Sequence, residues 1–165
     1  MYLLDTAVVL ELRKAKAGQT DPGLVTWARG VARQNLFISA ITLLELETSV
    51  AQLERKDKLA SAGLRAWLDQ QVTAAFESRV LPVDAAVVRR RAGLHYADPR
   101  DALMAATALE HRLTLVTREV AAFKSGRVKV FNPWGYRSEP AEDEADWRQV
   151  AKTSPSWLKN FFIRS

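Results

Sequence analysis

The sequence predicts an α/β domain built around a mostly parallel sheet of about five strands. Short apolar runs alternate with longer segments whose apolar residues recur at helical spacing, which is typical of parallel strands joined by crossover helices. A chain of 165 residues, 48% of them hydrophobic, is long enough to bury the core of one such domain. The predicted strands are 2–4, 36–38, 80–83, 113–116 and 128–131.

Five predicted helices lie between and after these runs. Asp21 and Asp98 are each followed by proline, and that pair typically opens a helix because aspartate caps the N-terminus and proline suits the first turn. Asp84 is a third predicted cap. Trp27 and Trp67 fall on apolar helix faces, so we expect both in the core. The predicted helices are 21–34, 42–56, 59–78, 84–96 and 98–111.

Composition narrows the choice of partner and of metal ligand. The net charge of +5 favours a polyanionic partner such as a nucleic acid. With no cysteine and only two histidines, a bound metal would be held mainly by carboxylates, which suits hard ions such as Mg²⁺ or Mn²⁺. No run approaches the roughly 18 apolar residues of a membrane span, and the first residues lack signal-peptide order, so we expect a cytoplasmic protein with no membrane contact.

Four acidic residues are expected at the carboxyl edge of the sheet, where ligands of parallel α/β domains bind. Asp5 ends the first strand, Glu45 lies in the first turn after the second, Asp101 opens the helix begun by Asp98, and Glu119 follows the strand ending near Thr117. Carboxylates gathered there would repel one another unless cations neutralised them. Such a cluster suits metal-assisted cleavage of phosphodiesters, in which a bound ion activates water.

Most of these acids also have an ordinary structural explanation. Thr42 and Glu45 have the spacing of a capping box. Asp98 is better explained as a helix cap than as a ligand, Asp101 could complement the helix dipole, and Glu119 could be a solvated loop acid. Asp5 is hardest to explain in this way, because a carboxylate that ends a buried strand needs a partner.

Over about residues 1–135 the chain resembles the PIN-domain family, and within it the VapC-type toxins of bacterial toxin–antitoxin systems. No single motif is specific, but their order and spacing together are. The segments that carry the resemblance are Tyr2-Leu3-Leu4-Asp5-Thr6, Leu10-Glu11-Leu12-Arg13-Lys14, Ile38-Ser39-Ala40-Ile41-Thr42-Leu43-Leu44-Glu45-Leu46, Asp101-Ala102-Leu103-Met104-Ala105-Ala106-Thr107-Ala108, Leu115-Val116-Thr117-Arg118 and Asn132-Pro133-Trp134.

The resemblance implies a three-layer α/β/α sandwich with the activity of a divalent-metal-dependent endoribonuclease. It also implies a homodimer, an RNA substrate and inhibition by a VapB-like antitoxin. Its site would use Mg²⁺ or Mn²⁺. The implied site residues are Asp5, Glu45 and Asp101 as catalytic, metal-binding acids, Glu119 near the fourth acidic position, and Thr6 and Thr117 as hydrogen-bonding partners within the site.

Three positions depart from the family pattern. Ala7 stands where asparagine is usual, Glu119 where asparagine or aspartate is usual, and Ala122 where aspartate is usual. These departures leave open a catalytically weakened PIN domain that binds RNA or an antitoxin without cutting. A phosphatase of the haloacid dehalogenase type is disfavoured, because no second aspartate stands two residues after Asp5.

Basic residues and the C-terminal extension complete the prediction. Arg100 and Arg118 each neighbour a candidate acid in sequence, so they are possible phosphate contacts. Residues 136–165 form a predicted extension beyond the PIN domain. It consists of an acidic segment followed by a short apolar helix that packs on its own domain or on a partner.

Overall fold

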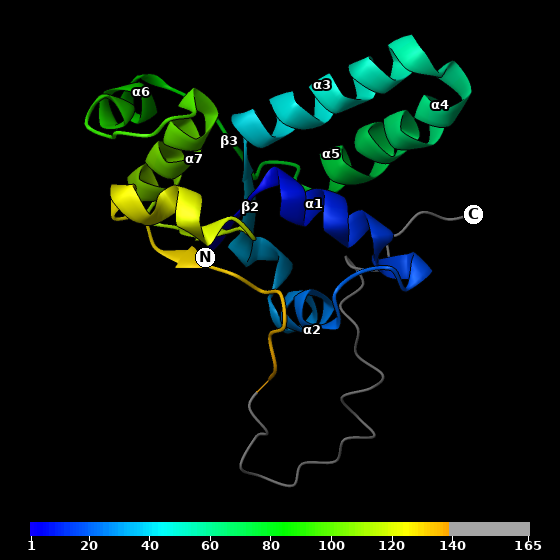
Figure 1. Ribbon diagram of the computed structural model, residues 1–165, viewed down its shortest axis with the longest axis horizontal. Coiled ribbons are helices and arrows are strands. Elements are labelled where there is room, and N and C mark those ends of the chain that lie inside the picture. The colour runs from blue at the N-terminus through cyan, green and yellow to red at the C-terminus, as the bar shows by residue number, and fades with distance from the viewer. Residues whose placement is uncertain (139–165) are drawn as a thin grey trace, which may run out of the picture.

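A five-stranded, all-parallel sheet lies at the centre of the structure, a computed structural model that describes residues 1–138 (Figure 1). The strand order is β3-β2-β1-β4-β5, so β1 is the central strand. Each strand overlaps an apolar run of the sequence, which confirms the predicted fold class. The strands are β1 (Tyr2–Leu4), β2 (Leu36–Ser39), β3 (Val80–Leu81), β4 (Thr114–Val116) and β5 (Val130–Phe131).

Helices cover both faces of the sheet, as a three-layer sandwich requires (Figure 1). The α-helices are α1 (Thr6–Arg13), α2 (Pro22–Gly30), α3 (Ala40–Lys56), α4 (Lys58–Trp67), α5 (Thr73–Ala75), α6 (Ala85–Ala92) and α7 (Pro99–Glu110). Short helical segments of other types are η1 (Lys14–Ala17), η2 (Arg33–Asn35), the π-helical η3 (Leu68–Val72) and η4 (Val120–Gly126). Within residues 1–138, none of the helices combines the length and apolar character needed to cross a membrane.

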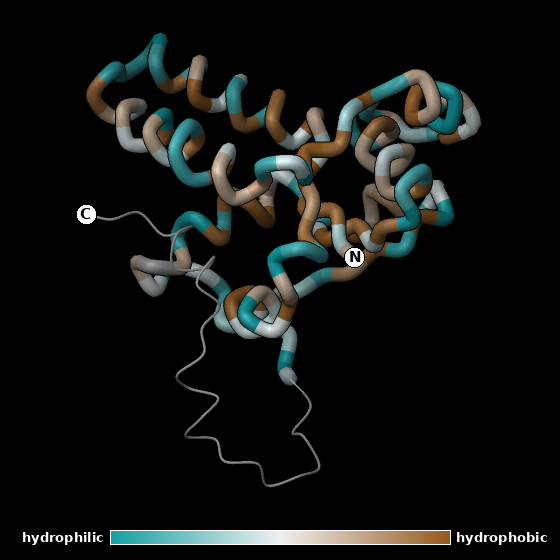
Figure 2. The backbone as a smooth tube through the Cα atoms, turned by 180° about the vertical axis from the view of Figure 1, so that it is seen from behind, coloured by the Kyte–Doolittle hydropathy of each residue, from teal (hydrophilic) through white to brown (hydrophobic). Residues whose placement is uncertain are grey.

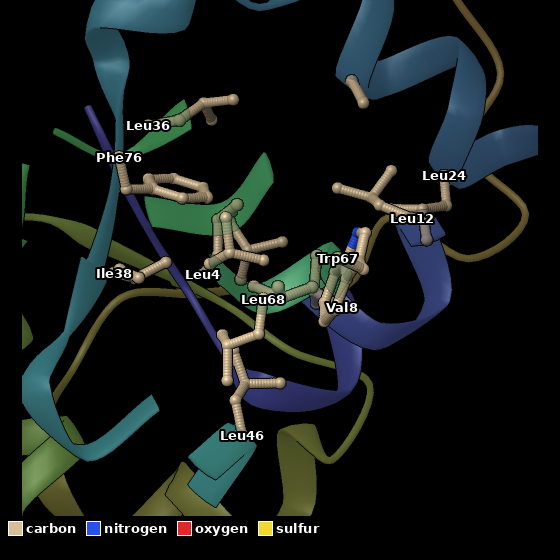
Figure 3. Close-up of a cluster of buried hydrophobic side chains, with 14 of the residues drawn as sticks. Leu4, Val8, Leu12, Leu24, Leu36, Ile38, Leu46, Trp67, Leu68 and Phe76 are labelled. Atoms are coloured by element: carbon tan, nitrogen blue, oxygen red, sulfur yellow. The ribbon is translucent and has the colours of Figure 1, made fainter. Parts of the chain in front are cut away.

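Strand alternation divides the core between the two faces of the sheet. Leu4 points into a cluster formed with α1, α2, α3 and α4, where Figure 3 shows it among Val8, Leu46 and Trp67. Leu3 points the other way, into a cluster formed with α7 and η4. Hydrophobic segments accordingly gather inside the fold, and hydrophilic ones lie on its outer turns (Figure 2). Trp67 is 1% exposed and Trp27 5%, which confirms that both belong to the core.

The start of α3 differs from the predicted capping box. The helix begins at Ala40, directly after β2, and Ser39 is its cap, with Oγ accepting from Ile41 N at 3.1 Å. Thr42 is instead fully buried, and its hydroxyl donates to Leu4 O at 3.2 Å. The capping-box interpretation is therefore wrong, because Ser39 is already in place to cap the helix. Glu45 has no capping role.

Other helix ends were predicted with mixed success. Asp84 accepts from Val87 N at 3.0 Å and Asp98 from Arg100 N at 2.7 Å, which confirms both caps. The helix predicted over 21–34 ends at Gly30, and that predicted over 84–96 ends at Ala92, where Gly93 follows. Glycine is a poor helix former, so both ends have a local cause. The helix predicted over 59–78 is divided by η3 into α4 and α5.

The chain after β5 is fastened to the start of α2. Asp21 Oδ1 accepts from Leu24 N and also from Gly135 N, both at 3.0 Å. Gly23 lies against this segment, and a Cβ at Gly23 would come within 2.7 Å of Gly135 N and closer still to Tyr136 N. Residue 23 therefore has to be glycine for the two segments to pack this closely. The predicted extension over 136–165 lies almost wholly outside the described residues, so its acidic segment and its helix stay predictions.

We predict that Gly23→Ala destabilises the protein by about 1–3 kcal/mol, because backbone rather than a flexible side chain fills the space of the new methyl group. Thermal unfolding followed by circular dichroism measures the loss. Gly63→Ala is the matched control: Gly63 also lies within a helix, and nothing lies within 4 Å of its Cβ position. That variant should gain up to about 1 kcal/mol. Equal melting temperatures for Gly23→Ala and the wild type would contradict the close packing.

Candidate active site

Asp5 stands at the point where the order of the sheet reverses. The chain leaves β1 toward β2 on one side, while β4 pairs with β1 on the other. In open parallel sheets the crevice at such a reversal is the usual ligand-binding position. Asp5 also caps α1, with Oδ1 accepting from Thr6 N at 2.6 Å. Its backbone N–H donates to Val116 O at 3.0 Å, which fixes Asp5 beside the end of β4.

Thr117 ties the loop after β4 to Asp5. Its buried hydroxyl donates to Asp5 Oδ2 at 2.6 Å and accepts from Glu119 N at 3.1 Å. Both oxygens of Asp5 therefore have a protein donor, one from the residue after it and one from the residue that follows β4. This arrangement fixes the direction of the carboxylate and positions the backbone of Glu119 beside it.

Glu45 brings α3 into the same crevice. The hydroxyl of Thr6 donates to Glu45 Oε2 in a short hydrogen bond, and Arg100 Nη1 lies 3.6 Å from Oε1. The side chain of Glu45 is 26% exposed and that of Arg100 60% exposed, so the ion pair is partly open to solvent. Glu45 is thereby connected to the start of α1 and to the start of α7.

The acids act on one another electrostatically. Burial raises the pKa of Asp5, and the charges of Glu45 and Glu119 raise it further, against the opposing hydrogen bonds from Thr117 and Thr6. Burial also raises the pKa of Asp101, with added contributions from Asp98, Asp5 and Glu45. Each of these carboxyls therefore holds its proton more tightly than an isolated aspartate does.

The donor set fits a hard divalent cation. The groups are all carboxylate or hydroxyl oxygens. Burial is the main cause of the raised pKa of Asp5 and Asp101, the neighbouring acids add to it, and a bound cation would favour the charged form of both groups. Across residues 1–138, no group of three or more acidic or histidine side chains is arranged so that it could hold a metal ion. Mg²⁺ is usually held by one or two carboxylates and keeps several waters, so a site for it does not require three converging side chains.

The structure brings the residues predicted from the sequence to one edge of the sheet, but they differ in burial and in contacts. Asp5, Glu45 and Asp101 are half-buried, whereas Glu119 is exposed. Arg100 reaches Glu45, but Arg118 turns toward Trp134, with its guanidinium carbon 5.9 Å from the centre of the indole ring. Whether these residues bind metal or phosphate stays a prediction.

Sequence reasoning missed the side chains that flank this edge. Trp134 was seen only as part of a terminal motif, and its contact with Arg118 depends on the pairing of β4 with β5. Tyr96 was not singled out, yet the charge of Asp101 contributes to the raised pKa of its phenol, after burial. No local pattern in the sequence indicates either contact, because each joins segments that meet only in the folded chain.

Comparisons with known proteins agree with this architecture. The PIN domain family matches residues 2–124. The chain is 34% identical over 142 residues to Toxin FitB from Neisseria gonorrhoeae, covering 81% of this chain and 99% of that protein. It is 31% identical over 149 residues to VapC ribonuclease Y4jK from Sinorhizobium fredii, covering 86% of this chain and 100% of that protein. The crystal structure of FitAcB from Neisseria gonorrhoeae matches with a TM-score of 0.71 at 34% identity, covering 81% of this chain and 99% of that one.

These similarities extend over the part of the chain that forms the site. The family match runs from β1 into η4, so it includes the segments that carry Asp5, Glu45, Asp101 and Glu119. The relatives align over nearly their whole lengths, so the likeness is not confined to one motif. The chain therefore belongs to the PIN-domain family, and within that family it groups with the VapC-type toxins.

Proposed function

We propose that this protein is a divalent-metal-dependent endoribonuclease and the toxin of a toxin–antitoxin pair. One observation carries the proposal: the carboxylate of Asp5 is held by two hydrogen bonds at the reversal point of the sheet, within electrostatic reach of Glu45, Asp101 and Glu119. The names of the relatives support it, since one is a toxin and another is a ribonuclease. The positive net charge of +5 is consistent with an RNA substrate.

Each residue has a distinct task in this proposal. Asp5, Glu45 and Asp101 would hold Mg²⁺ or Mn²⁺, and the exposed Glu119 would add a fourth negative charge beside them. When bound, such an ion lowers the pKa of a water molecule and stabilises the oxygen that leaves the phosphorus. Thr117 orients Asp5 and Thr6 orients Glu45 by the hydrogen bonds described above.

Arg100 has two tasks in this proposal. Its guanidinium pairs with Glu45 at 3.6 Å and is mostly exposed, so it can neutralise the acid and also meet a phosphate of the incoming strand. We assign it to substrate positioning. The proposed partners are a VapB-like antitoxin, which would keep the toxin inactive, and a second copy of this chain in a homodimer.

A weakened, binding-only PIN domain is the second candidate, and specific residues favour it. Ala7 and Ala122 are exposed and carry no polar group, at positions where the family pattern has one. Neither can hydrogen-bond a metal-bound water. This candidate predicts RNA binding without cleavage.

A cleavage assay separates these two candidates. Purified full-length protein should cut a mixed single-stranded RNA with Mn²⁺ or Mg²⁺ and not with chelator. Asp5→Asn and Asp101→Asn should each reduce the cleavage rate at least about 100-fold, because each removes a charged metal ligand. Gel analysis of end-labelled RNA measures the rates.

The matched control for that experiment is Asp98→Asn. Asparagine caps a helix as well as aspartate does, so α7 should keep its start while the charge three residues from Asp101 is lost. Cleavage by this variant should stay within about threefold of the wild type. RNA binding without cleavage by folded wild-type protein, with either metal, would favour the second candidate.

Thr117→Val tests how far the reaction depends on the orientation of Asp5. Valine keeps the shape of the buried side chain but removes the hydroxyl that bonds both Asp5 and Glu119 N. Loss of such a supporting hydrogen bond typically reduces metal affinity or activity about 10- to 100-fold. Thr117→Ser, which keeps the hydroxyl, should restore most of the rate. Similar rates for Thr117→Val and Thr117→Ser would show that this hydrogen bond is not needed.

The raised pKa of Asp101 leads to a prediction about stability. Because the pKa in the folded protein lies above the ordinary value of 3.8, the folded state binds the proton more tightly than the unfolded state. The free energy of unfolding therefore falls as the pH rises from 3.8 through the raised pKa. With chelator at pH near 7, Asp101→Asn should melt at a higher temperature than the wild type, and the gain should vanish below pH 3.8.

Calorimetry on the two proteins measures that difference. Added Mn²⁺ should raise the melting temperature of the wild type more than that of Asp101→Asn, because the variant lacks one ligand. A variant that melts at or below the wild-type temperature at neutral pH without metal would contradict the raised pKa of Asp101, which burial and the neighbouring acids cause.

A further inference from the structure

Arg118 and Trp134 form a polar–aromatic pair beside the candidate site. Arg118 directly follows Thr117, which bonds Asp5, and directly precedes Glu119. Its guanidinium carbon lies 5.9 Å from the centre of the Trp134 ring. Arg118 therefore differs from an arginine elsewhere on the surface, because its backbone lies between Thr117 and Glu119, which both belong to the candidate site.

The turn that carries Trp134 is held on both sides. Asn132 Oδ1 accepts from Trp134 N at 2.9 Å, and Gly135 N donates to Asp21 at 3.0 Å. The preceding strand is fixed as well, since Thr117 N donates to Phe131 O at 3.1 Å. The indole is therefore presented from a fastened turn whose strand is bonded to the residue before Arg118.

Arg118 and Trp134 are also accessible to solvent. Arg118 is exposed, and Trp134 is only partly buried against the core. No carboxylate among residues 1–138 forms an ion pair with Arg118, whereas Arg100, the other arginine next to a candidate acid, pairs with Glu45. In the described part of the chain, the planar group of Arg118 therefore lies against the Trp134 ring and is not held by a carboxylate.

We propose that Arg118 and Trp134 together form a stacking site for one nucleobase of a single-stranded RNA, next to the acidic crevice. This inference rests on the proposed function, because it assigns part of the binding site for the same substrate. Aromatic rings and guanidinium planes are the groups on which proteins stack unpaired bases. In a duplex the bases are already stacked on one another, so this site selects single-stranded RNA.

Arg118 lies between Thr117 and Glu119 in the sequence, and this position connects base stacking to cleavage. A base held by Arg118 and Trp134 fixes the strand beside the loop that Thr117 fastens to Asp5, so a neighbouring phosphate can reach the acidic residues. The pair thereby sets which phosphodiester enters the crevice. Stacking is tolerant of base identity, so the preference it confers is for an unpaired base rather than for one sequence.

The test compares RNA that carries bases with RNA of the same length that lacks one. Full-length protein with chelator is titrated with short single-stranded RNAs, each with 2-aminopurine or an abasic site at a different position. For the wild type we expect quenching of 2-aminopurine at one position. Affinity should fall about 5- to 150-fold when that same position is abasic.

Two variants separate stacking from charge. Arg118→Lys keeps the charge but removes the planar group, so binding of base-bearing RNA should weaken about 2- to 30-fold with an unchanged salt dependence. Arg118→Gln should in addition lower the slope of log affinity against log salt by about 0.7. Arg55→Gln is the matched control, since Arg55 is an exposed arginine near the far end of α3, and its binding of abasic and base-bearing RNA should keep the wild-type ratio.

Trp134 is tested with a pair of substitutions, because it also packs on the core. Trp134→Phe keeps a ring and should keep the preference for base-bearing over abasic RNA. Trp134→Leu should lose that preference, and its circular dichroism is recorded to show that it folds. If Trp134→Leu unfolds, Arg118→Lys still decides the question. The proposal is overturned if folded Arg118→Lys keeps the full wild-type preference for base-bearing over abasic RNA. It is also overturned if folded Trp134→Leu keeps that preference.

Failure of this inference and failure of the proposed function give different results. Metal-dependent cleavage by the wild type, together with an unchanged base preference in Arg118→Lys, overturns the stacking site and leaves the nuclease. A base preference that depends on Arg118 and Trp134, in a protein that cuts nothing with any metal, supports the stacking site and overturns the nuclease.

Discussion

The carboxylate of Asp5 is the constraint on which the rest of the site depends. It ends a strand whose neighbouring side chains are fully buried, so its charge has to be compensated by donors that the fold itself supplies. Thr6 N and the Thr117 hydroxyl supply them. Thr117 can do so only because β4 lies beside β1 with Leu4 opposite Val116. The direction of the Asp5 carboxylate therefore depends on the topology of the sheet.

The same geometry brings several acids of like charge close to one another. Asp5 and Asp101 have raised pKa values, and Arg100 offsets only part of the negative charge through Glu45. Sites that gather like charges are stable because the surrounding structure keeps them together. Here the two apolar clusters on the faces of the sheet do this, since they fix β1, α3 and α7 whatever the site contains.

Much of this could be predicted from the sequence, because it follows from local patterns. The apolar runs predicted all five strands, and the Asp-Pro pairs predicted the starts of α2 and α7. Thr42 was misread as a cap, because the pattern of a capping box does not show that Ser39 is already placed to cap. The contact of Arg118 with Trp134 was missed because it depends on the register of β4 and β5. The four acids and the hydrogen-bonding roles of Thr6 and Thr117 were predicted, but not that Thr6 bonds Glu45 and Thr117 bonds Asp5.

The fastening of the chain after β5 has a consequence for the sheet as a whole. β5 is an edge strand of two residues, and unpaired edge strands can pair with a strand of another molecule. The bond from Gly135 to Asp21, and the close approach to Gly23, turn the chain onto α2 directly after this strand (Figure 1). The strand therefore cannot lengthen in that direction, and a short edge strand offers few backbone groups to a strand of another molecule. Gly23, in the first turn of α2, thus helps to keep this edge of the sheet short.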